Sequence, residues 1–157
     1  MKSKKPGWRL LAIAAVLVLY SSCDRQTLYH HYEPTSRDGW ERSDTLLFTV
    51  TKAQKRAVVQ REVELRVTKA YPFKNLHLVV EQTTLPQHQF RRDTINCMLT
   101  TSDGRIIGDG ISLYQYRFPL SDISLNEGDS LCIHVSHDMK REILHGISDI
   151  GIRLTAY

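Results

Sequence analysis

The chain has 157 residues with 21 Lys or Arg and 17 Asp or Glu, which gives a formal net charge of +4 at pH 7. The excess of positive charge lies entirely in the first nine residues, in Lys2, Lys4, Lys5 and Arg9, so 17 basic residues balance the 17 acidic ones in the rest of the chain. This balance argues against a nucleic-acid-binding protein, which needs a basic surface, and the length suits a single domain.

Residues 1–22 are typical of a lipoprotein signal peptide. The basic start is followed by an uncharged apolar run at 10–20, which is shorter than the roughly 20 residues that a membrane-spanning helix needs. The run ends in Ser21, Ser22 and Cys23, and small residues before a cysteine are what a lipoprotein signal peptidase requires, although Tyr20 stands where an aliphatic residue is usual. We therefore expect cleavage before Cys23 and lipidation of its thiol, for instance by palmitate. The alternative is an ordinary secretory peptide with an incidental cysteine.

Residues 23–43 are polar and show no sustained period, which predicts a lipidated tether that becomes ordered near Tyr29 or Trp40. From Asp44 onward apolar and polar residues alternate, which is the pattern of half-buried strands. The domain is therefore expected to span residues 44–157.

The alternation predicts a series of short strands within 44–157. We expect them at 45–51, 58–68, 76–83, 94–101, 111–118, 130–136 and 150–154. The connections contain turn residues, including Asp103-Gly104 and the run 126–129, while 85–92 reads as a longer loop and 108–110 as a bulge. A short helical turn could form at 137–146. Roughly seven to nine short strands without a long helix predict an all-β fold, an antiparallel β-sandwich of the jelly-roll or Ig-like type.

Two cysteines remain after Cys23, and an exported protein can pair them. The alternation places Cys97 on the apolar face of its strand but Cys132 on the polar face of another. A disulfide needs converging side chains, so free thiols are favoured, although pairing stays open.

The residues that could support catalysis or metal binding are badly placed for it. His134 and His137 have the spacing of some metal sites, but on one strand they point to opposite faces. Ser136, His137 and Asp138 are consecutive, whereas a catalytic triad converges from separate elements. We expect no enzyme activity, no metal and no cofactor.

Two groups of residues are candidates for binding a partner. Aromatic residues could form a platform for a carbohydrate or a protein; they are Tyr71, Phe73, Tyr114, Tyr116 and Phe118. The C-terminal region is dense in charges of both signs, and its Arg141 and Asp149 are candidates for a docking edge. The alternatives are core packing for the aromatic residues and a solvated loop for the charges.

Three segments resemble a known family. They are YPFKNLHLVVEQT at 71–83, GISLYQYRFPL at 110–120 and HDMKREILHGISDIGIRL at 137–154, and they are similar to the gliding-motility lipoprotein GldH family. The likeness extends from about Tyr29 to the C-terminus and includes the N-terminal signal.

The resemblance implies a membrane-anchored lipoprotein of the cell envelope that serves the gliding-motility and associated secretion machinery together with other envelope lipoproteins. Only Cys23 acquires a defined role from it, as the lipidation site. We expect a non-enzymatic scaffold or stabilising component in the outer membrane, facing the periplasm. The alternative is a glycan-binding envelope lipoprotein of a nutrient-uptake system.

Overall fold

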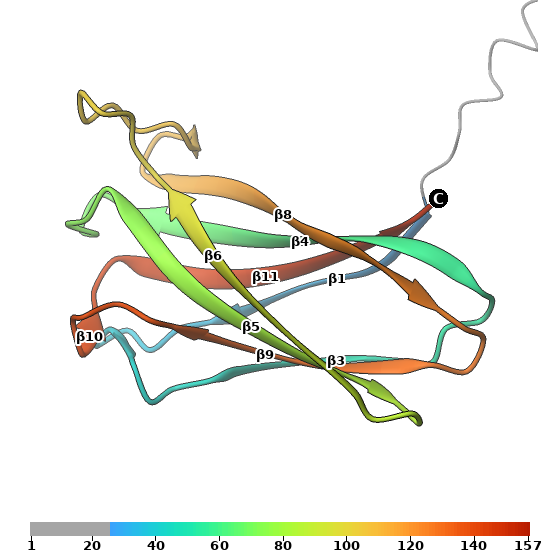
Figure 1. Ribbon diagram of the computed structural model, residues 1–157. Coiled ribbons are helices and arrows are strands. Elements are labelled where there is room, and N and C mark those ends of the chain that lie inside the picture. Colours follow the sequence, from blue (N-terminus) through green and yellow to red (C-terminus); the bar gives the residue numbers. More distant parts are fainter. Residues whose placement is uncertain (1–25) are drawn as a thin grey trace, which may run out of the picture.

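The computed structural model describes residues 26–157, which form two antiparallel sheets packed face to face (Figure 1). The strands are β1 (Gln26–Pro34), β2 (Trp40–Glu41), β3 (Leu46–Val50), β4 (Ala57–Thr68), β5 (Asn75–Leu85), β6 (Gln89–Met98), β7 (Asp109–Gly110), β8 (Leu113–Leu125), β9 (Ser130–His137), β10 (Ile143–Leu144) and β11 (Ile147–Ala156). No helix in this part of the chain is long and apolar enough to cross a bilayer.

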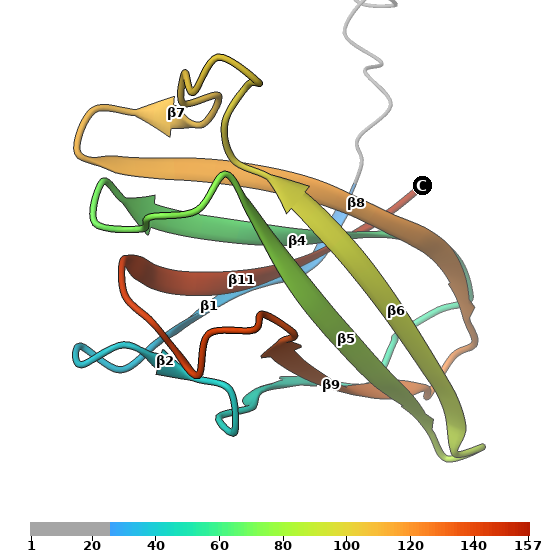
Figure 2. The ribbon, with the colours of Figure 1, turned by 60° about the vertical axis from the view of Figure 1, so that its left-hand side comes forward.

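The order of the strands is that of a jelly roll. One sheet has the order β1-β11-β4-β8-β7 and the other β3-β9-β5-β6, while β2 and β10 form a separate two-stranded ladder. Without the three two-residue strands, eight remain, four in each sheet, and most connections cross from one sheet to the other (Figure 2). The predicted all-β sandwich is thus confirmed.

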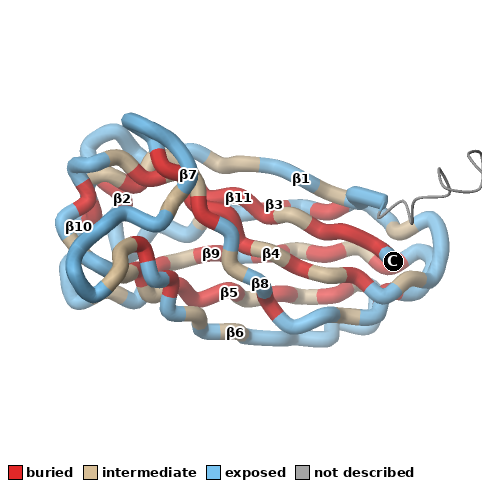
Figure 3. The backbone as a smooth tube through the Cα atoms, turned by 90° about the horizontal axis from the view of Figure 1, so that it is seen from above, coloured by how far each residue is buried: buried red, intermediate tan, exposed pale blue. Residues whose placement is uncertain are grey.

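The core is formed by the inner faces of the two sheets. On β4 the side chains of Val59, Val63 and Leu65 are fully buried, and on the facing strand β5 those of Leu76 and Leu78 are too. Figure 3 shows this inner layer as red segments along the long strands, with the loops at both ends largely exposed. The period-two pattern therefore identified the core face of these strands correctly.

The sandwich has two distinct ends, which the pairing of the strands defines. At one end, Gln26 of β1 pairs with Ala156 of β11, which pairs with Val59 of β4. At the other end, Thr68 of β4 pairs with Leu113 of β8. Because Val59 and Thr68 are nine residues apart on β4 and a strand rises about 3.3 Å per residue, the two ends lie about 30 Å apart. We call them the proximal end and the distal end.

Three elements differ from the sequence-based expectation. Strand β1 lies within the range 23–43, which was expected to be a tether. The alternation of apolar and polar residues does not reveal this strand, because it is a sheet edge whose side chains are mostly exposed. Residues 137–146 contain no helical turn but the short strand β10, whose Leu144 is buried. The expected loop at 85–92 is a turn at 86–88, because the polar residues that follow it lie on the exposed edge strand β6.

Strand β8 also continues beyond Pro119, where the pattern predicts a stop. Pro119 pairs with Glu62 of β4 on one side, and β7 pairs only with Tyr114 and Gln115 on the other. Proline lacks a backbone N–H, but an edge strand needs none on its unpaired side. The strand therefore continues to Leu125.

Gly146, in the loop before β11, packs against the backbone of the turn at Tyr71, and this contact can be tested by substitution. Its φ is +90°, its carbonyl accepts a hydrogen bond from the Thr68 backbone N–H at 2.8 Å, and a Cβ at this position would lie 2.3 Å from the Tyr71 backbone nitrogen. We predict that Gly146→Ala lowers the free energy of unfolding by about 3 kcal/mol or more, because both the backbone conformation and the space oppose a side chain. The measurement is urea denaturation of the purified protein.

Gly104 is the matched control, because its φ is +87° but a Cβ at this position would have nothing within 4 Å of it. Gly104→Ala should cost only about 1 kcal/mol, which is the penalty of the left-handed conformation alone. Equal losses for the two variants would contradict the packing of Gly146 against the turn at Tyr71.

Candidate functional site

The predicted lipidation site lies outside the described residues. Cys23 precedes the first described residue, Gln26, by three positions, so its lipidation stays a prediction. Strand β1, which follows it directly, is the element through which an anchor at Cys23 would be joined to the domain. The contacts that hold β1 in its sheet therefore decide how firmly such an anchor would orient the domain.

The outer face of this sheet contains a buried carboxylate that binds β1. Glu64 of β4 is fully buried, although it lies on the solvent side of the sheet. His30 Nε2 lies 2.9 Å from Glu64 Oε2, and the Tyr32 hydroxyl donates a hydrogen bond to the same oxygen. On the other side, Arg117 Nε of β8 lies 3.3 Å from Oε1 and Arg153 of β11 is 3.9 Å away. Four strands therefore meet at one carboxylate.

The position of Tyr32 depends on the residue beneath it. Tyr32 pairs with Gly151 of β11, and a Cβ on Gly151 would lie 2.7 Å from the tyrosine ring. The Arg66 guanidinium lies 3.8 Å from the centre of the ring, and the Gln115 amide donates to the Tyr32 hydroxyl at 2.9 Å. The ring thus lies flat across the sheet and covers Glu64, which explains how an outward-facing carboxylate becomes buried.

The electrostatics of this cluster favour the ionised carboxylate. Burial would raise the pKa of Glu64, but the hydrogen bonds from Tyr32 and His30 and the nearby charges outweigh it and lower the pKa. For Tyr32, burial and the hydrogen bond to Glu64 raise the pKa to about 12. At neutral pH the pair is therefore a carboxylate that accepts a hydrogen bond from a protonated hydroxyl, and we call these residues with Arg117 and Arg153 the Glu64 cluster.

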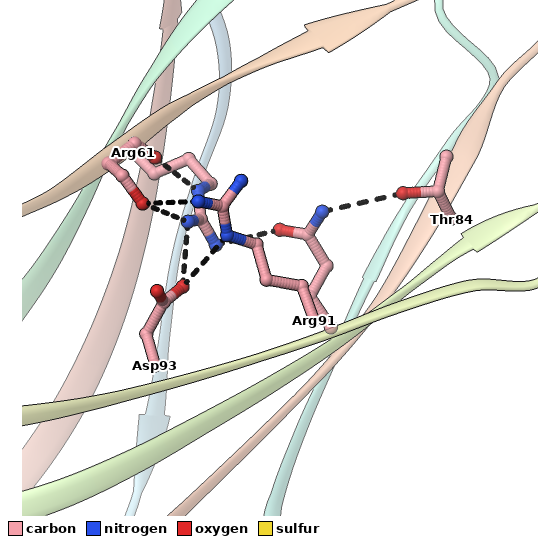
Figure 4. Close-up of polar contacts among 6 residues, drawn as sticks. Arg61, Thr84, Arg91 and Asp93 are labelled. Carbon is pink, nitrogen blue, oxygen red and sulfur yellow. Dashed lines mark hydrogen bonds and ion pairs between the residues drawn. The ribbon is translucent and has the colours of Figure 1, made fainter.

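A second polar network joins the two sheets. Arg61 lies on the inner face of β4, and its side chain is 1% exposed. Its Nη2 lies 2.7 Å from Asp93 Oδ2 of β6, and its Nη1 donates to Gln82 Oε1 of β5 at 3.0 Å. Figure 4 shows how these groups converge from the two sheets, with Arg91 also reaching Asp93 and the Ser121 hydroxyl.

A bulge in β8 completes the Arg61 network. Leu120 pairs with Arg61 and Ile123 with Val59, so β8 has one residue more than β4 in this stretch. The extra residue places the Ser121 carbonyl where Arg61 Nε donates to it at 2.9 Å. Burial lowers the pKa of Arg61 and the contacts with Asp93 oppose this effect, so the guanidinium stays charged and paired.

Both networks join strands, because the charged groups in each are paired with one another, with Glu64 Oε1 3.3 Å from Arg117 Nε and Arg61 Nη2 2.7 Å from Asp93 Oδ2. Burial raises the pKa of the Cys97 thiol to about 12, so at neutral pH it is protonated and unsuited to nucleophilic attack. No group of three or more His, Cys, Asp or Glu within residues 26–157 is arranged to hold a metal ion. The chemistry that this arrangement offers is structural.

The aromatic residues considered as a candidate binding platform lie in the core or pack against it, which is the alternative of core packing. Tyr114 and Tyr116 are only 9% and 7% exposed, and the Tyr116 hydroxyl donates to the Leu99 carbonyl inside the fold. Tyr71 is also buried, and Phe118 stacks on Tyr116 and is half-buried. The platform is therefore corrected to core packing, because the face of β8 that carries Tyr114 and Tyr116 points between the sheets.

The predicted charged residues lie apart. Arg141 is exposed in the loop between β9 and β10, at the distal end. Asp149 is half-buried on β11, where Ser148 donates to it at 2.7 Å and its register partners are Pro34 and Arg66. Arg141 remains a candidate contact for a partner, whereas Asp149 is largely engaged within its sheet.

The histidines and cysteines follow the predicted faces. His137 is buried against Trp40, with ring centres 5.1 Å apart, while His134 is exposed on the other face. Cys97 and Cys132 are free thiols, the first buried in the core and the second half-buried beside His134. Their location on different faces explains why they do not form a disulfide.

Sequence reasoning missed Glu64 and Arg61 as buried residues. Arg61 occupies the inner position between Val59 and Val63, so a charge within an apolar row was the available signal. The sequence around Glu64 contains no such signal, because the burial of Glu64 results from Tyr32, more than 30 residues away in sequence.

Comparison with known proteins identifies relatives over almost the whole chain. The model of the GldH lipoprotein family matches residues 27–154. The gliding motility lipoprotein GldH of Flavobacterium johnsoniae strain UW101 is 24% identical over 161 residues, which cover 98% of each chain.

Solved structures resemble this domain only distantly. A family 35 carbohydrate binding module from Clostridium thermocellum has 7% identity and a TM-score of 0.39, covering 79% of this chain and 89% of that one. The Eiger TNF structure from S. frugiperda has 12% identity and a TM-score of 0.31, covering 84% and 94%. No functional conclusion follows from similarities of this size.

The Glu64 cluster makes a testable contribution to stability. We predict that Glu64→Gln lowers the free energy of unfolding at pH 7 by about 1–3 kcal/mol, because Arg117 and Arg153 lose their buried partner. Since the pKa of Glu64 is lowered in the folded state from its ordinary 4.5, its contribution is present above that pH and is lost on acidification. The variant should therefore show a shallower loss of stability between about pH 6 and pH 3, measured by urea denaturation.

Glu62→Gln is the control, because Glu62 lies on the same face of β4, two residues away, but is only half-buried. Its substitution should change the free energy of unfolding by less than about 0.5 kcal/mol. A similar loss in both variants, or an unchanged pH profile in Glu64→Gln, would count against the cluster.

Proposed function

This chain belongs to the GldH lipoprotein family, and we propose that it acts as a non-enzymatic scaffold that stabilises the gliding-motility and associated secretion machinery. The family places it among gliding-motility lipoproteins of the cell envelope. The proposal adds an anchor at Cys23, a location in the outer membrane facing the periplasm, and other envelope lipoproteins as partners.

The anchor is supported by the signal at 1–22 and by the position of β1. Three residues span at most about 10 Å, so lipid on Cys23 would hold the start of β1 within that distance of the membrane. Two or three acyl chains bind a membrane stably, whereas one does not. The proximal end of the sandwich would then face the bilayer and the distal end would project away from it.

The single observation that carries the scaffold proposal is the attachment of β1. The strand pairs with β11 from Gln26 to Pro34, and its His30 and Tyr32 bind Glu64 of β4. The described chain thus enters the main sheet at Gln26, three residues after Cys23, which favours an end-on orientation of an anchored domain.

A scaffold role also agrees with the use of the ionisable groups. The most deeply buried charges, Arg61 and Glu64, are engaged in cross-linking strands. The glycan-binding alternative drew on exposed aromatic residues, but Tyr114 and Tyr116 are in the core. We therefore favour a protein partner over a glycan.

The anchor is tested by metabolic labelling with a clickable fatty acid. The wild-type protein should be labelled and Cys23→Ala should not, because the thiol is the proposed acceptor. Cys132→Ala is the control, because Cys132 is a half-buried thiol of the folded domain, and it should keep the label. Persistent labelling of Cys23→Ala would refute the anchor.

The partner contact at the distal end is tested by reversing a charge. Arg141 is exposed there, so Arg141→Glu should reduce in-cell chemical cross-linking to other envelope lipoproteins, measured by mass spectrometry. Arg56→Glu, at an exposed position next to β4 at the proximal end, should leave the cross-links unchanged. If both variants keep the wild-type pattern, Arg141 is not a contact.

A further inference from the structure

The distal end displays an unusual group of exposed apolar side chains. The segment from Met98 to Leu113 presents five of them to solvent, namely Met98, Ile106, Ile107, Ile111 and Leu113, with Ile111 87% exposed and Ile107 52% exposed. Single exposed apolar residues are common, but several within one segment mark an interaction surface. We call these five residues the apolar tip.

The tip has a fixed shape. The Ile107 N–H donates to the Leu99 carbonyl at 3.2 Å, and Thr100 and Ile106 form an isolated antiparallel β-bridge. Gly108 lies against the Tyr116 ring so closely that a Cβ would be 2.5 Å from it, and the following residues form β7, which pairs with β8. The segment that carries these side chains is therefore attached to the sandwich, and Figure 2 shows β7 beside β8 at the edge of its sheet.

A cavity lies next to the tip. Its volume is about 410 Å³, and its lining includes Met98 and Ile107 of the tip together with Phe118, while Asp109 and Arg117 also contribute to its wall. This size falls within the range of sites that take up a small molecule or a side chain. The tip thus combines a projecting apolar surface with an adjacent recess.

In the proposed end-on orientation, the tip points away from the membrane that would hold Cys23. Leu113 is the register partner of Thr68 at the distal end, whereas Gln26 lies at the proximal end, level with Val59 and about 30 Å away along β4. The three residues from Cys23 to Gln26 add at most about 10 Å. An anchored molecule that stands end-on therefore turns its apolar tip away from its own bilayer.

A second copy fits the tip poorly. Two copies that met head-on through their tips would hold the starts of their N-terminal strands about 60 Å apart, at opposite ends of the pair. Both copies then could not be anchored in one membrane. The remaining occupant is a different protein that offers an apolar surface.

We propose that the apolar tip is the docking surface for a different envelope protein, which covers Ile107 and Ile111 with an aliphatic or aromatic surface and places an apolar side chain in the cavity beside Phe118. This inference rests on the proposed anchor at Cys23, because the anchor sets which way the tip points. It names the surface and the chemistry of the partner, which the scaffold proposal leaves open.

The test uses the full-length chain in its native cells with the photo-reactive residue p-benzoylphenylalanine at position 111. Irradiation should give an adduct with one other envelope protein, identified by mass spectrometry, and a photo-reactive residue in that protein should return the reciprocal adduct. The control position is 47, because Leu47 is 50% exposed on β3 in the other sheet. We expect about tenfold less adduct from position 47.

Substitution provides the second measurement. Ile107→Asp with Ile111→Asp should lower the amount of the complex about tenfold, while the cellular level and fatty-acid labelling stay at wild-type values. Leu47→Asp should leave the complex intact. Because all three side chains are exposed, the substitutions should leave the fold intact, and the melting temperature of each purified variant checks this.

Three outcomes would overturn the inference. They are an adduct between two copies of the chain, an adduct with lipid, and equal yields from positions 111 and 47. Failure of the anchor is seen separately, because it leaves Cys23→Ala labelled by the fatty acid whatever position 111 captures.

Discussion

The fold depends on how the Glu64 carboxylate is neutralised. A buried carboxylate without partners would be strongly unfavourable, so Glu64 requires the groups that surround it. These come from three neighbouring strands: His30 and Tyr32 from β1, Arg117 from β8 and Arg153 from β11. A slip of any of these strands by one residue would move its partner to the opposite face. The carboxylate therefore favours the observed register of the sheet β1-β11-β4-β8.

The Arg61 network links the two sheets to each other, whereas the Glu64 cluster links strands within one sheet. Arg61 of β4 reaches Gln82 of β5 and Asp93 of β6, so it links the inner side of one sheet to strands of the other. Apolar packing alone would leave the relative position of two sheets loosely specified, whereas a charged and directional contact fixes it. The two networks lie on opposite faces of the same strand, which makes β4 the organising element of the sandwich.

The core could be predicted from the sequence, and the buried polar residues could not. Alternation over 58–68 identified Val59, Val63 and Leu65 as core residues, because the period of a strand is a local property. It does not say by itself whether a row of tyrosines points inward, so Tyr114 and Tyr116 were candidates for an exposed platform although core packing is the more common role of such a row. The burial of Glu64 could not be predicted, because it depends on the pairing of β1, a strand that the sequence pattern did not indicate.

The attachment of β1 has a mechanical consequence. The hydrogen bonds between antiparallel strands run perpendicular to the strands, and β1 pairs with β11 along its whole length. A tensile load between an N-terminal lipid and the far end of the domain would act parallel to β1. The backbone bonds would then share that load in shear instead of opening one after another, so with a lipid on Cys23 the strand next to the anchor would resist pulling well.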